Sequence, residues 1–310
     1  MTTNKFDFIG DIHGHVDALE KLLKKLGYSQ VDGTYKHPSR QAFFVGDFID
    51  RGPQVLKTLE IVKRMVDAGS ALAVMGNHEF NFIQLFTKSA ENPDEWARPH
   101  EKMHQAQTTL DDFEGKEDLL HEYIAWFKTL PVYFETDQFR VVHAQWDDRS
   151  IEKVKKLCYS DDGSERHGIL NEKYFSHTQG EAHDAIEMLL SGFEMELPNG
   201  ITFNDTYNKP RNEMRIMWWE RGEALSLQDV ADYKVKLDDA ASNIPYSHDA
   251  YKQYGPKDVP IFFGHYCLQR AIDLRQNNIC CLDFCVGKGG ELVGYSFNGE
   301  EVLDEGNLIY

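Results

Sequence analysis

Five apolar segments of the sequence are each followed by side chains that can bind a metal ion. The segments are residues 6–9, 42–45, 72–75, 139–142 and 260–263, and they precede Asp11 and His13, Asp47, Asn77, His143, and His265, in that order. Carboxylate, amide and imidazole donors without a thiolate suit Mn²⁺, Fe, Zn²⁺ or Co²⁺ better than Ca²⁺. Asp47 can bridge two cations through its two oxygens, and two metal ions ~3.5–4 Å apart clamp a phosphate during in-line displacement. The residue types therefore predict a centre of two divalent metal ions, with Mn²⁺ as the first candidate.

Alternating strand and helix patterns in the first half of the sequence would position these side chains. We expect strands at residues 5–9, 41–45 and 71–75, and helices at 15–26, at 55–68 and from 79 onward. This alternation predicts a buried and largely parallel sheet. Ligands collect beyond the carboxyl ends of parallel strands, so the five strand ends should lie along one rim. A glycine precedes the ligand in four of the five cases, which lets the backbone turn sharply beside the site.

The second half of the sequence is harder to interpret. We expect a hairpin of strands 132–135 and 139–142, a helix at 181–191, strands at 214–219 and 260–263, and antiparallel strands within 279–310 with a turn at 298–299. Residues 150–256 are acidic and separate two candidate ligands that must converge. We therefore predict a single domain over 1–310, in which part of residues 150–256 forms a cap or insertion beside the metal site.

Three motifs carry a family resemblance. Residues 10–14 read Gly-Asp-Ile-His-Gly, residues 46–52 read Gly-Asp-Phe-Ile-Asp-Arg-Gly, and residues 76–79 read Gly-Asn-His-Glu. Together they resemble the signature blocks of the calcineurin-like metallophosphoesterases, and the second is similar to the phosphoprotein phosphatase branch, which also holds bacterial diadenosine tetraphosphatases. The resemblance implies an α/β fold, namely a four-layer α/β/β/α sandwich of two mixed sheets flanked by helices.

The resemblance also implies roles for individual residues. The first metal ion would be held by Asp11, His13 and Asp47, and the second by Asp47, Asn77, His143 and His265. The catalytic residues would be His78, which protonates the leaving oxygen, Asp50, which orients the His78 ring, and Arg51, which grips phosphate oxygens. Substrate would also contact Asn77 and a second arginine, for which Arg215 and Arg221 are candidates beside the alternative of ordinary strand arginines. A metal-bound hydroxide would attack phosphorus directly, with no phosphoenzyme.

The substrate is less defined than the reaction. After His143 the sequence reads Ala-Gln-Trp instead of the Gly-Gly or Ala-Gly of the family, and the stretch up to His265 is long. We expect hydrolysis of phosphomonoesters, with phosphoserine or phosphothreonine in proteins as the leading class. The alternatives are a dinucleoside polyphosphate hydrolase and, in another class, an inactive binding module of the same fold. The complete ligand set and His78 speak against the binding module.

Composition limits the partners. The net charge of −18 opposes binding to nucleic acid polymers and to anionic membranes, and no apolar run reaches the ~18 residues of a membrane span. The five cysteines are odd in number and contain no Cys-x-x-Cys pair, so we expect free thiols and a cytoplasmic protein. Trp218 and Trp219 could stack on a nucleobase or pack in the core, whereas residues 287–290 predict a turn between strands. The oligomeric state stays open.

Overall fold

The first sheet carries three of the predicted ligand-bearing strands. In the computed structural model, which describes residues 5–158, 164, 166–204, 208–222, 224–232, 234–247, 253–274 and 276–310, its order is β17-β16-β1-β4-β5. Its strands are β1 (Lys5–Ile9), β4 (Arg40–Phe44), β5 (Ala71–Ala73), β16 (Gly294–Phe297) and β17 (Leu308–Ile309). Strands β1, β4 and β5 run parallel, as predicted, while β16 pairs antiparallel with β1.

A second sheet carries the other two ligand-bearing strands. Its order is β13-β12-β7-β6, with β6 (Tyr133–Glu135), β7 (Arg140–Val142), β12 (Ile261–Phe263) and β13 (Ile279–Cys281). The predicted hairpin of β6 and β7 is confirmed, and β7 and β12 are parallel. The five strands do not belong to one sheet, as the expected single rim required, but the residues that follow them still come together.

Aromatic side chains fill the space between the sheets. Phe8 on β1 stacks on Phe262 on β12, with ring centroids 3.7 Å apart, and Phe139 lies edge-on to Phe8 at 5.1 Å. The opposite face of β1 points away from the second sheet. There the buried Asp7 carboxylate accepts hydrogen bonds from Arg40 at 2.8 Å and from Tyr28 at 3.0 Å. Alternation along β1 therefore divides it between an apolar inter-sheet face and a face toward the helices.

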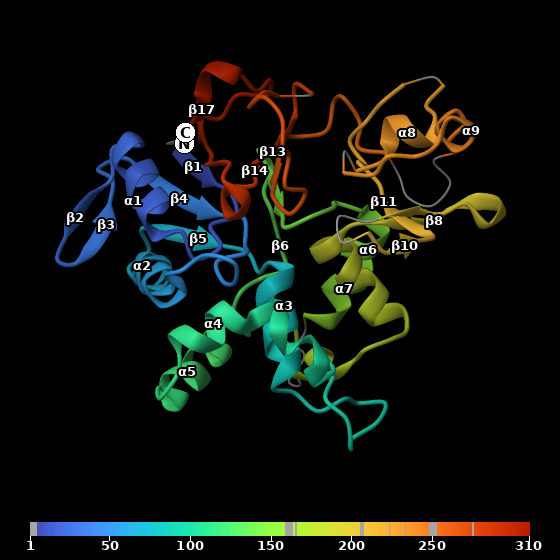
Figure 1. Cartoon of the computed structure of the whole chain (residues 1–310). Helices are drawn as coiled ribbons and strands as arrows, with labels where there is room; N and C mark the ends of the chain where they lie inside the picture. Colours follow the sequence, from blue (N-terminus) through green and yellow to red (C-terminus); the bar gives the residue numbers. More distant parts are fainter. Residues whose placement is uncertain are drawn as a thin grey trace.

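Helices cover the outer faces of both sheets, which gives the four layers that the resemblance implied (Figure 1). The helices are α1 (Val16–Lys25), α2 (Val55–Asp67), α3 (Asn77–Leu85), α4 (Gln107–Asp112), α5 (Glu117–Phe127), α6 (Asp148–Leu157), α7 (Glu181–Ser191), α8 (Leu227–Val230) and α9 (Asp239–Ser242). Helices α1 and α2 lie on the side of the first sheet, and α6 and α7 on the side of the second. In α1, Leu19, Leu22 and Leu23 are buried at helical spacing, which turns this stripe toward the sheet.

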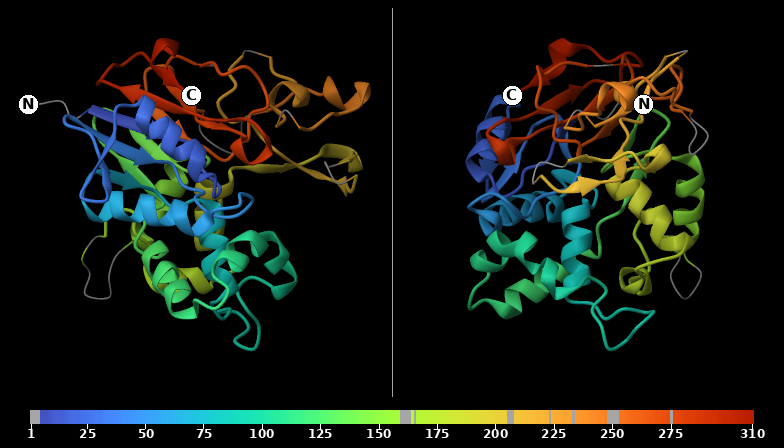
Figure 2. Two further views of the ribbon diagram at one scale, coloured as in Figure 1. Left: turned by 60° about the vertical axis from the view of Figure 1, so that its left-hand side comes forward. Right: turned by 45° about the vertical axis from the view of Figure 1, so that its right-hand side comes forward.

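The segment between β7 and β12 contains the least predictable elements. Its short strands are β8 (Glu194–Glu196), β9 (Phe203–Asn204), β10 (Pro210–Arg211) and β11 (Glu213–Arg215), which pair as β8–β11 and β9–β10. The strand expected at 214–219 is therefore shorter and displaced. In Figure 2 this yellow segment and the orange segment with α8 and α9 extend away from the blue first sheet. The prediction of a single domain with an insertion stays a prediction.

Four further short strands lie outside the two main sheets, and the tail of the chain differs from its prediction in two details. They are β2 (Ser29–Val31), β3 (Thr34–Lys36), β14 (Asp283–Phe284) and β15 (Glu291–Leu292), and they form the hairpin-like pairs β2–β3 and β14–β15. The tail is not wholly antiparallel, because β13 runs parallel to β12. Residue Gly299 turns the chain with a φ of 93°, but the connection from β16 to β17 is a longer loop rather than a two-residue hairpin.

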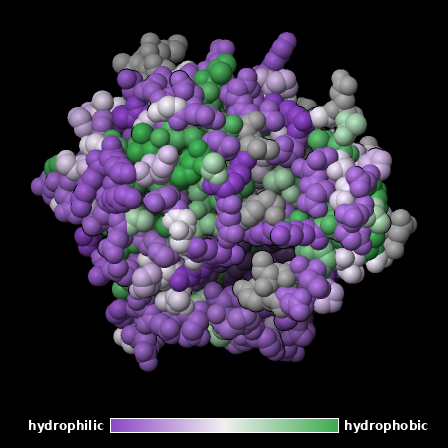
Figure 3. Space-filling view, turned by 45° about the horizontal axis from the view of Figure 1, so that its top comes forward, coloured by the Kyte–Doolittle hydropathy of each residue, from purple (hydrophilic) through white to green (hydrophobic). Residues whose placement is uncertain are grey.

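The surface contrasts with this aromatic core. The face drawn in Figure 3 is mostly hydrophilic, and apolar residues occupy separate areas of it. Among the described residues, none of the helices combines the length and the apolar character needed to cross a membrane.

The expectation of free thiols was wrong for two cysteines. Cys267 and Cys285 form a disulfide, whereas Cys280 and Cys281 keep their thiols. The bond joins the loop after β12 to the turn after β14, so the two sulfurs meet only through the folding of distant strands. Cysteine usage therefore no longer argues for a reducing compartment.

Reducing this disulfide is expected to lower the free energy of unfolding by about 3 kcal/mol. The bond joins residues 18 positions apart, and opening a loop of this length restores conformational entropy to the unfolded chain. Urea unfolding with and without a phosphine reductant measures the change. The double variant Cys267→Ala/Cys285→Ala serves as control, since its midpoint should not respond to the reductant. An equal midpoint in the unsubstituted protein under both conditions would contradict the prediction.

Candidate metal centre and adjoining pocket

The structure brings all six predicted metal ligands to one place. They are Asp11 and His13 after β1, Asp47 after β4, Asn77 at the start of α3, His143 after β7, and His265 after β12. Three of them, His13, Asp47 and His265, adopt positive φ angles of 46°, 55° and 71°. Such angles are costly for residues other than glycine and cluster at functional sites. The chain therefore accepts backbone strain at the positions that aim these side chains inward.

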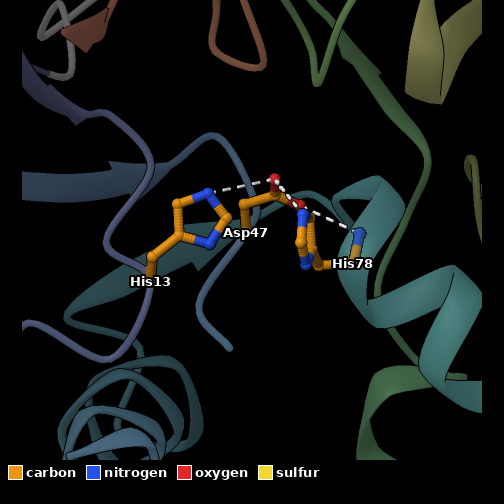
Figure 4. Close-up of side chains that lie close together, drawn as sticks. All are labelled: His13, Asp47 and His78. Carbon is orange, nitrogen blue, oxygen red and sulfur yellow. Dashed lines mark hydrogen bonds and ion pairs between the residues drawn. The ribbon is translucent and has the colours of Figure 1, made fainter. Parts of the chain in front are cut away.

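Asp47 stands at the centre of the group. Its Oδ2 lies 3.6 Å from Nε2 of His13 and 3.8 Å from Nε2 of His78, and its Oδ1 lies 3.3 Å from Nε2 of His143. Figure 4 shows the Asp47 carboxylate between the rings of His13 and His78. Two sets of possible ligand atoms, each within 4.8 Å of one another, share it: His13, Asp47 and His78, and Asp47, His143 and His265. This sharing is the arrangement that a carboxylate bridging two cations requires.

Backbone carbonyls orient two of the imidazoles. Nδ1 of His13 lies 2.8 Å from the carbonyl oxygen of Ile49, and Nδ1 of His143 lies 2.8 Å from that of Val45. When Nδ1 carries the proton and donates to the carbonyl, Nε2 keeps its lone pair for a metal ion. In both rings Nε2 is the atom that faces Asp47.

Unpartnered buried atoms provide a test of whether this site fits metal ions. Oδ1 of Asp11, Nε2 of His13 and Nε2 of His265 are buried and have no hydrogen-bond partner among the described residues. A buried polar atom without a partner is costly, and coordination of a cation would satisfy each of these atoms. The donor set, with oxygen and nitrogen and no sulfur, suits divalent ions such as Mn²⁺. The residues present therefore fit the predicted pair of ions.

Two predicted ligands take less direct positions. Oδ1 of Asn77 lies 3.1 Å from Nε2 of His143 and 3.0 Å from Nδ1 of His265, so it adjoins the second set. Oδ2 of Asp11 accepts a hydrogen bond at 2.9 Å from the backbone N–H of His265. The compact first set contains His78 where the resemblance implied Asp11. The assignment of Asp11 as a ligand stays a prediction.

Burial and close charges shift the proton affinities of the site. Burial alone would raise the pKa of Asp47, but His143 and His78 outweigh it and hold this pKa well below its usual value. Burial would lower the pKa of His143, yet Asp47 raises it to about 10. Burial, aided by the nearby carboxylate of Asp283, raises the pKa of Asp11. The same negative field that retains a proton on His143 attracts a cation, and metal binding would displace that proton.

Glu79 supports the turn that carries Asp47. Its buried carboxylate accepts backbone hydrogen bonds from Asp47 at 2.9 Å, Phe48 at 2.8 Å and Gly76 at 3.0 Å. A Cβ atom at Gly76 would collide with Oδ1 of Asp47, so only glycine permits this approach of two loops. Glu79 belongs to the motif at residues 76–79, but the motif alone indicated no role for its side chain. Its place directly after His78 was the available signal.

The His78 ring lies between the carboxylate of Asp50 and the guanidinium of Arg51. Its Nδ1 lies 2.5 Å from Oδ2 of Asp50, and its Nε2 lies 3.2 Å from Nη2 of Arg51. Burial would lower the pKa of His78, but Asp47 and Asp50 outweigh it and raise the pKa above its usual value. The hydroxyl of Thr109 donates to Oδ1 of Asp50 at 2.5 Å and accepts from its backbone N–H at 3.0 Å. Thr109 thus fixes the carboxylate that orients His78, and no sequence pattern pointed to it.

A cavity of about 680 Å³ opens beside His78 and Arg51. Five cationic side chains line it: Arg51, Arg98, Lys102, Lys209 and Arg211. Among its described lining residues the one carboxylate is Asp50, which is engaged by His78 and Thr109. Arg211 lies on β10 and Lys209 directly precedes it, in the long segment between the last two ligands. The four cations beyond Arg51 could not be predicted from the sequence, because they form two pairs in distant parts of the chain and share no motif.

Arg215 lies beside the metal centre but does not line this cavity. Its Nη2 donates to Oε1 of Glu194 at 2.8 Å, across the β8–β11 pair. Its charge nevertheless reaches the centre, since burial and then Arg215 lower the pKa of His265. The predicted contact of Arg215 with substrate stays a prediction.

Three other sequence hypotheses can be compared with the structure. Arg221 donates to the carbonyl of Tyr254 at 2.9 Å and to Asn278 at 3.2 Å and does not line the cavity beside His78, so its contact with phosphate stays a prediction. The stacking hypothesis was wrong, because Trp218 and Trp219 are both buried and pack against the strand β12. The turn at 287–290 is confirmed, and it connects β14 to β15.

Comparisons with known proteins identify the family of this chain. The family described as calcineurin-like phosphoesterase matches residues 5–184, which include five of the six predicted ligands and all three motifs. The chain is 33% identical over 160 residues to a bis(5'-nucleosyl)-tetraphosphatase PrpE [asymmetrical] of Oceanobacillus iheyensis. It is 36% identical over 148 residues to the protein of the same name in Halalkalibacterium halodurans.

These matches cover parts of the chains. They span 49% and 45% of this chain, and 60% and 56% of the two relatives. Among solved structures, the chain resembles a cold-active protein tyrosine phosphatase of a psychrophilic Shewanella species with a TM-score of 0.49 and 19% identity. That comparison covers 97% of this chain and 80% of the other.

Proposed function

The chain belongs to the calcineurin-like phosphoesterase family, and from this premise we propose that it is a metal-dependent hydrolase of dinucleoside polyphosphates such as diadenosine tetraphosphate. The observation that carries the choice of substrate is the charge of the pocket. Five cations face one engaged carboxylate there, in a chain whose net charge is −18. A local positive site in an acidic protein selects anionic substrates and concentrates them.

The number of cations favours a polyphosphate over a phosphomonoester. A phosphoserine or phosphothreonine brings a charge of about −1.5 to −2, which Arg51 and the metal ions would already balance. A single phosphate group is too small to contact the four further cations that line the cavity as well. A polyphosphate chain spreads its charges over a greater length and can meet them. The names of the two bacterial relatives support the same choice.

The residues of the site would have distinct roles in the hydrolysis. The two sets of ligands around Asp47 would hold two divalent ions, for which we propose Mn²⁺. Such ions polarise phosphoryl oxygens and lower the pKa of water, which supplies a nucleophile at neutral pH. Arg51 would brace phosphate oxygens. His78, held 2.5 Å from Asp50, would give its proton to the leaving oxygen.

A comparison of substrates tests the proposal. The purified protein with Mn²⁺ should show a kcat/KM for diadenosine tetraphosphate at least about tenfold above that for a phosphothreonine peptide, since one added charge-assisted contact is worth this much. Chromatography of the nucleotides and a phosphate-release assay measure the two rates. A preference for the phosphopeptide would support the protein phosphatase alternative and overturn the proposal. Absence of hydrolysis with both substrates, in protein that retains two metal ions, would do the same.

A further inference from the structure

Arg98 is a cation of the pocket whose guanidinium is held in place by the side-chain amides of two neighbours. Its Nη1 donates to Oδ1 of Asn81 at 2.6 Å, and its Nη2 donates to Oε1 of Gln105 at 2.7 Å. Its backbone N–H also donates to the carbonyl oxygen of Gln84 at 3.2 Å. Both ends of the guanidinium are therefore oriented, and its position is fixed before any ligand arrives.

The partners of Arg98 leave its charge available. Within the described part of the chain, no carboxylate lies within ion-pair distance of it. Other arginines differ: Arg140 pairs with Glu135 at 2.9 Å, and Arg215 with Glu194 at 2.8 Å. Amide oxygens orient a guanidinium without neutralising it, while a carboxylate would do both. A half-buried arginine that has no ion pair keeps N–H groups available for an anion from outside.

The location of Arg98 connects it to the catalytic residues. It lines the same cavity as Arg51 and His78, and its charge interacts with that of Glu187 and, more weakly, with that of Asp50. Asn81, which holds it, lies on α3 three residues after His78, so about 5 Å farther along the helix axis. An anion bound by Arg98 would therefore lie beside a phosphate at His78 but displaced along α3.

We propose that Arg98, oriented by Asn81 and Gln105, forms a distal-phosphate subsite that binds the part of a linear oligophosphate chain beyond the bond that is cleaved. The subsite rests on the proposed function for its use in catalysis, but its chemistry is that of a fixed guanidinium for phosphate oxygens. Lys102, Lys209 and Arg211 line the same cavity and extend the positive surface. The length of this surface selects compounds with consecutive phosphates over compounds with one.

Binding of two phosphonates tests the subsite without any turnover. Methylenediphosphonate and methylphosphonate resist hydrolysis and differ by one phosphonate group. Calorimetry on the Mn²⁺-loaded protein gives the ratio of their dissociation constants, which removes differences in metal loading. In Arg98→Gln, the preference for the diphosphonate should fall about tenfold, because a charge-assisted bidentate contact is lost. The control Arg64→Gln, an exposed arginine of α2 outside the cavity, should keep the unsubstituted ratio.

A second variant separates anion binding from a structural role of Arg98. Gln105→Glu keeps the side chain's shape and retains Arg98 in place, but it supplies a carboxylate that neutralises the guanidinium. It should lose the diphosphonate preference as Arg98→Gln does, while its thermal unfolding midpoint stays at or above that of the unsubstituted protein. If both variants keep the unsubstituted ratio, the subsite is wrong. If the ratio falls in both but the protein does not hydrolyse diadenosine tetraphosphate, the subsite stands and the proposed function falls.

Discussion

Replacing Asp47 with asparagine is expected to lower kcat/KM by about 10³-fold or more. The carboxylate lies within 3.6 Å of Nε2 of both His13 and His143, and it belongs to both sets of possible ligands. Loss of its negative charge would weaken the binding of both metal ions. Metal ions contribute several kcal/mol to such transition states, and each 1.36 kcal/mol is a factor of ten in rate. Steady-state kinetics and elemental analysis of the bound metal measure the two effects together.

A second aspartate offers a matched control for this substitution. Asp32, in the exposed turn between β2 and β3, has a φ of 51°, close to the 55° of Asp47. Asparagine tolerates this left-handed conformation, so Asp32→Asn tests the backbone effect alone and should change neither activity nor metal content. Full activity of Asp47→Asn with two metal ions retained would exclude the bridging role.

The second large effect is expected from His78→Asn. General acid catalysis contributes ~10²–10⁴-fold, and its loss should be greatest for substrates whose leaving oxygen is a poor leaving group. An aryl phosphate with an activated leaving group needs less protonation, so its rate should fall less than that of an alkyl phosphate. The Asp50 contact at 2.5 Å and the Arg51 contact at 3.2 Å are what place this ring for the task. Kinetics with both esters on the same preparation give the comparison.

Metal content distinguishes this role from another one that the geometry allows. His78 also belongs to a set of possible metal ligands with His13 and Asp47. If it is the proton donor, His78→Asn keeps its metal ions and shows the unequal losses. If it is a ligand, the variant loses metal and both esters slow equally, which would refute the assignment. His37→Asn, a histidine beside Tyr28 and outside the cavity, is the control for the general effect of the substitution.

Much of the candidate site was predictable because its signals are local. Each ligand follows an apolar segment directly, and Asp11, Asp47 and Asn77 lie in motifs of a few residues. Burial of such a segment as a strand forces the next polar residue to the edge of the sheet. The strands β1, β4 and β5 and the helices α1, α2 and α7 followed from hydrophobic periodicity for the same reason.

The division of the strands between two sheets did not follow from periodicity. An apolar run such as 261–263 is compatible with either sheet, because both faces of its strand are buried. The pairing of Phe8 with Phe262 decides the matter, and it depends on shape complementarity between residues far apart in the chain. The disulfide between Cys267 and Cys285 was missed for a related reason, since cysteine spacing alone does not determine which sulfurs meet.

The sequence by itself predicted the chemistry of the centre: which side chains are candidate metal ligands, which histidine adjoins an aspartate, and which arginine follows that aspartate. Only the tertiary structure decided what surrounds that centre. The contact of Thr109 with Asp50 and the position of Arg98 between Asn81 and Gln105 depend on how the segment after α3 returns to the pocket. From the sequence alone, a polar side chain on a helix is expected to be solvated, because its neighbours in the fold are not known. An arginine whose nearest oxygens are carboxylates forms a surface ion pair, whereas one held by amide oxygens can bind an anion. The path of the chain decides which oxygens lie nearest to it.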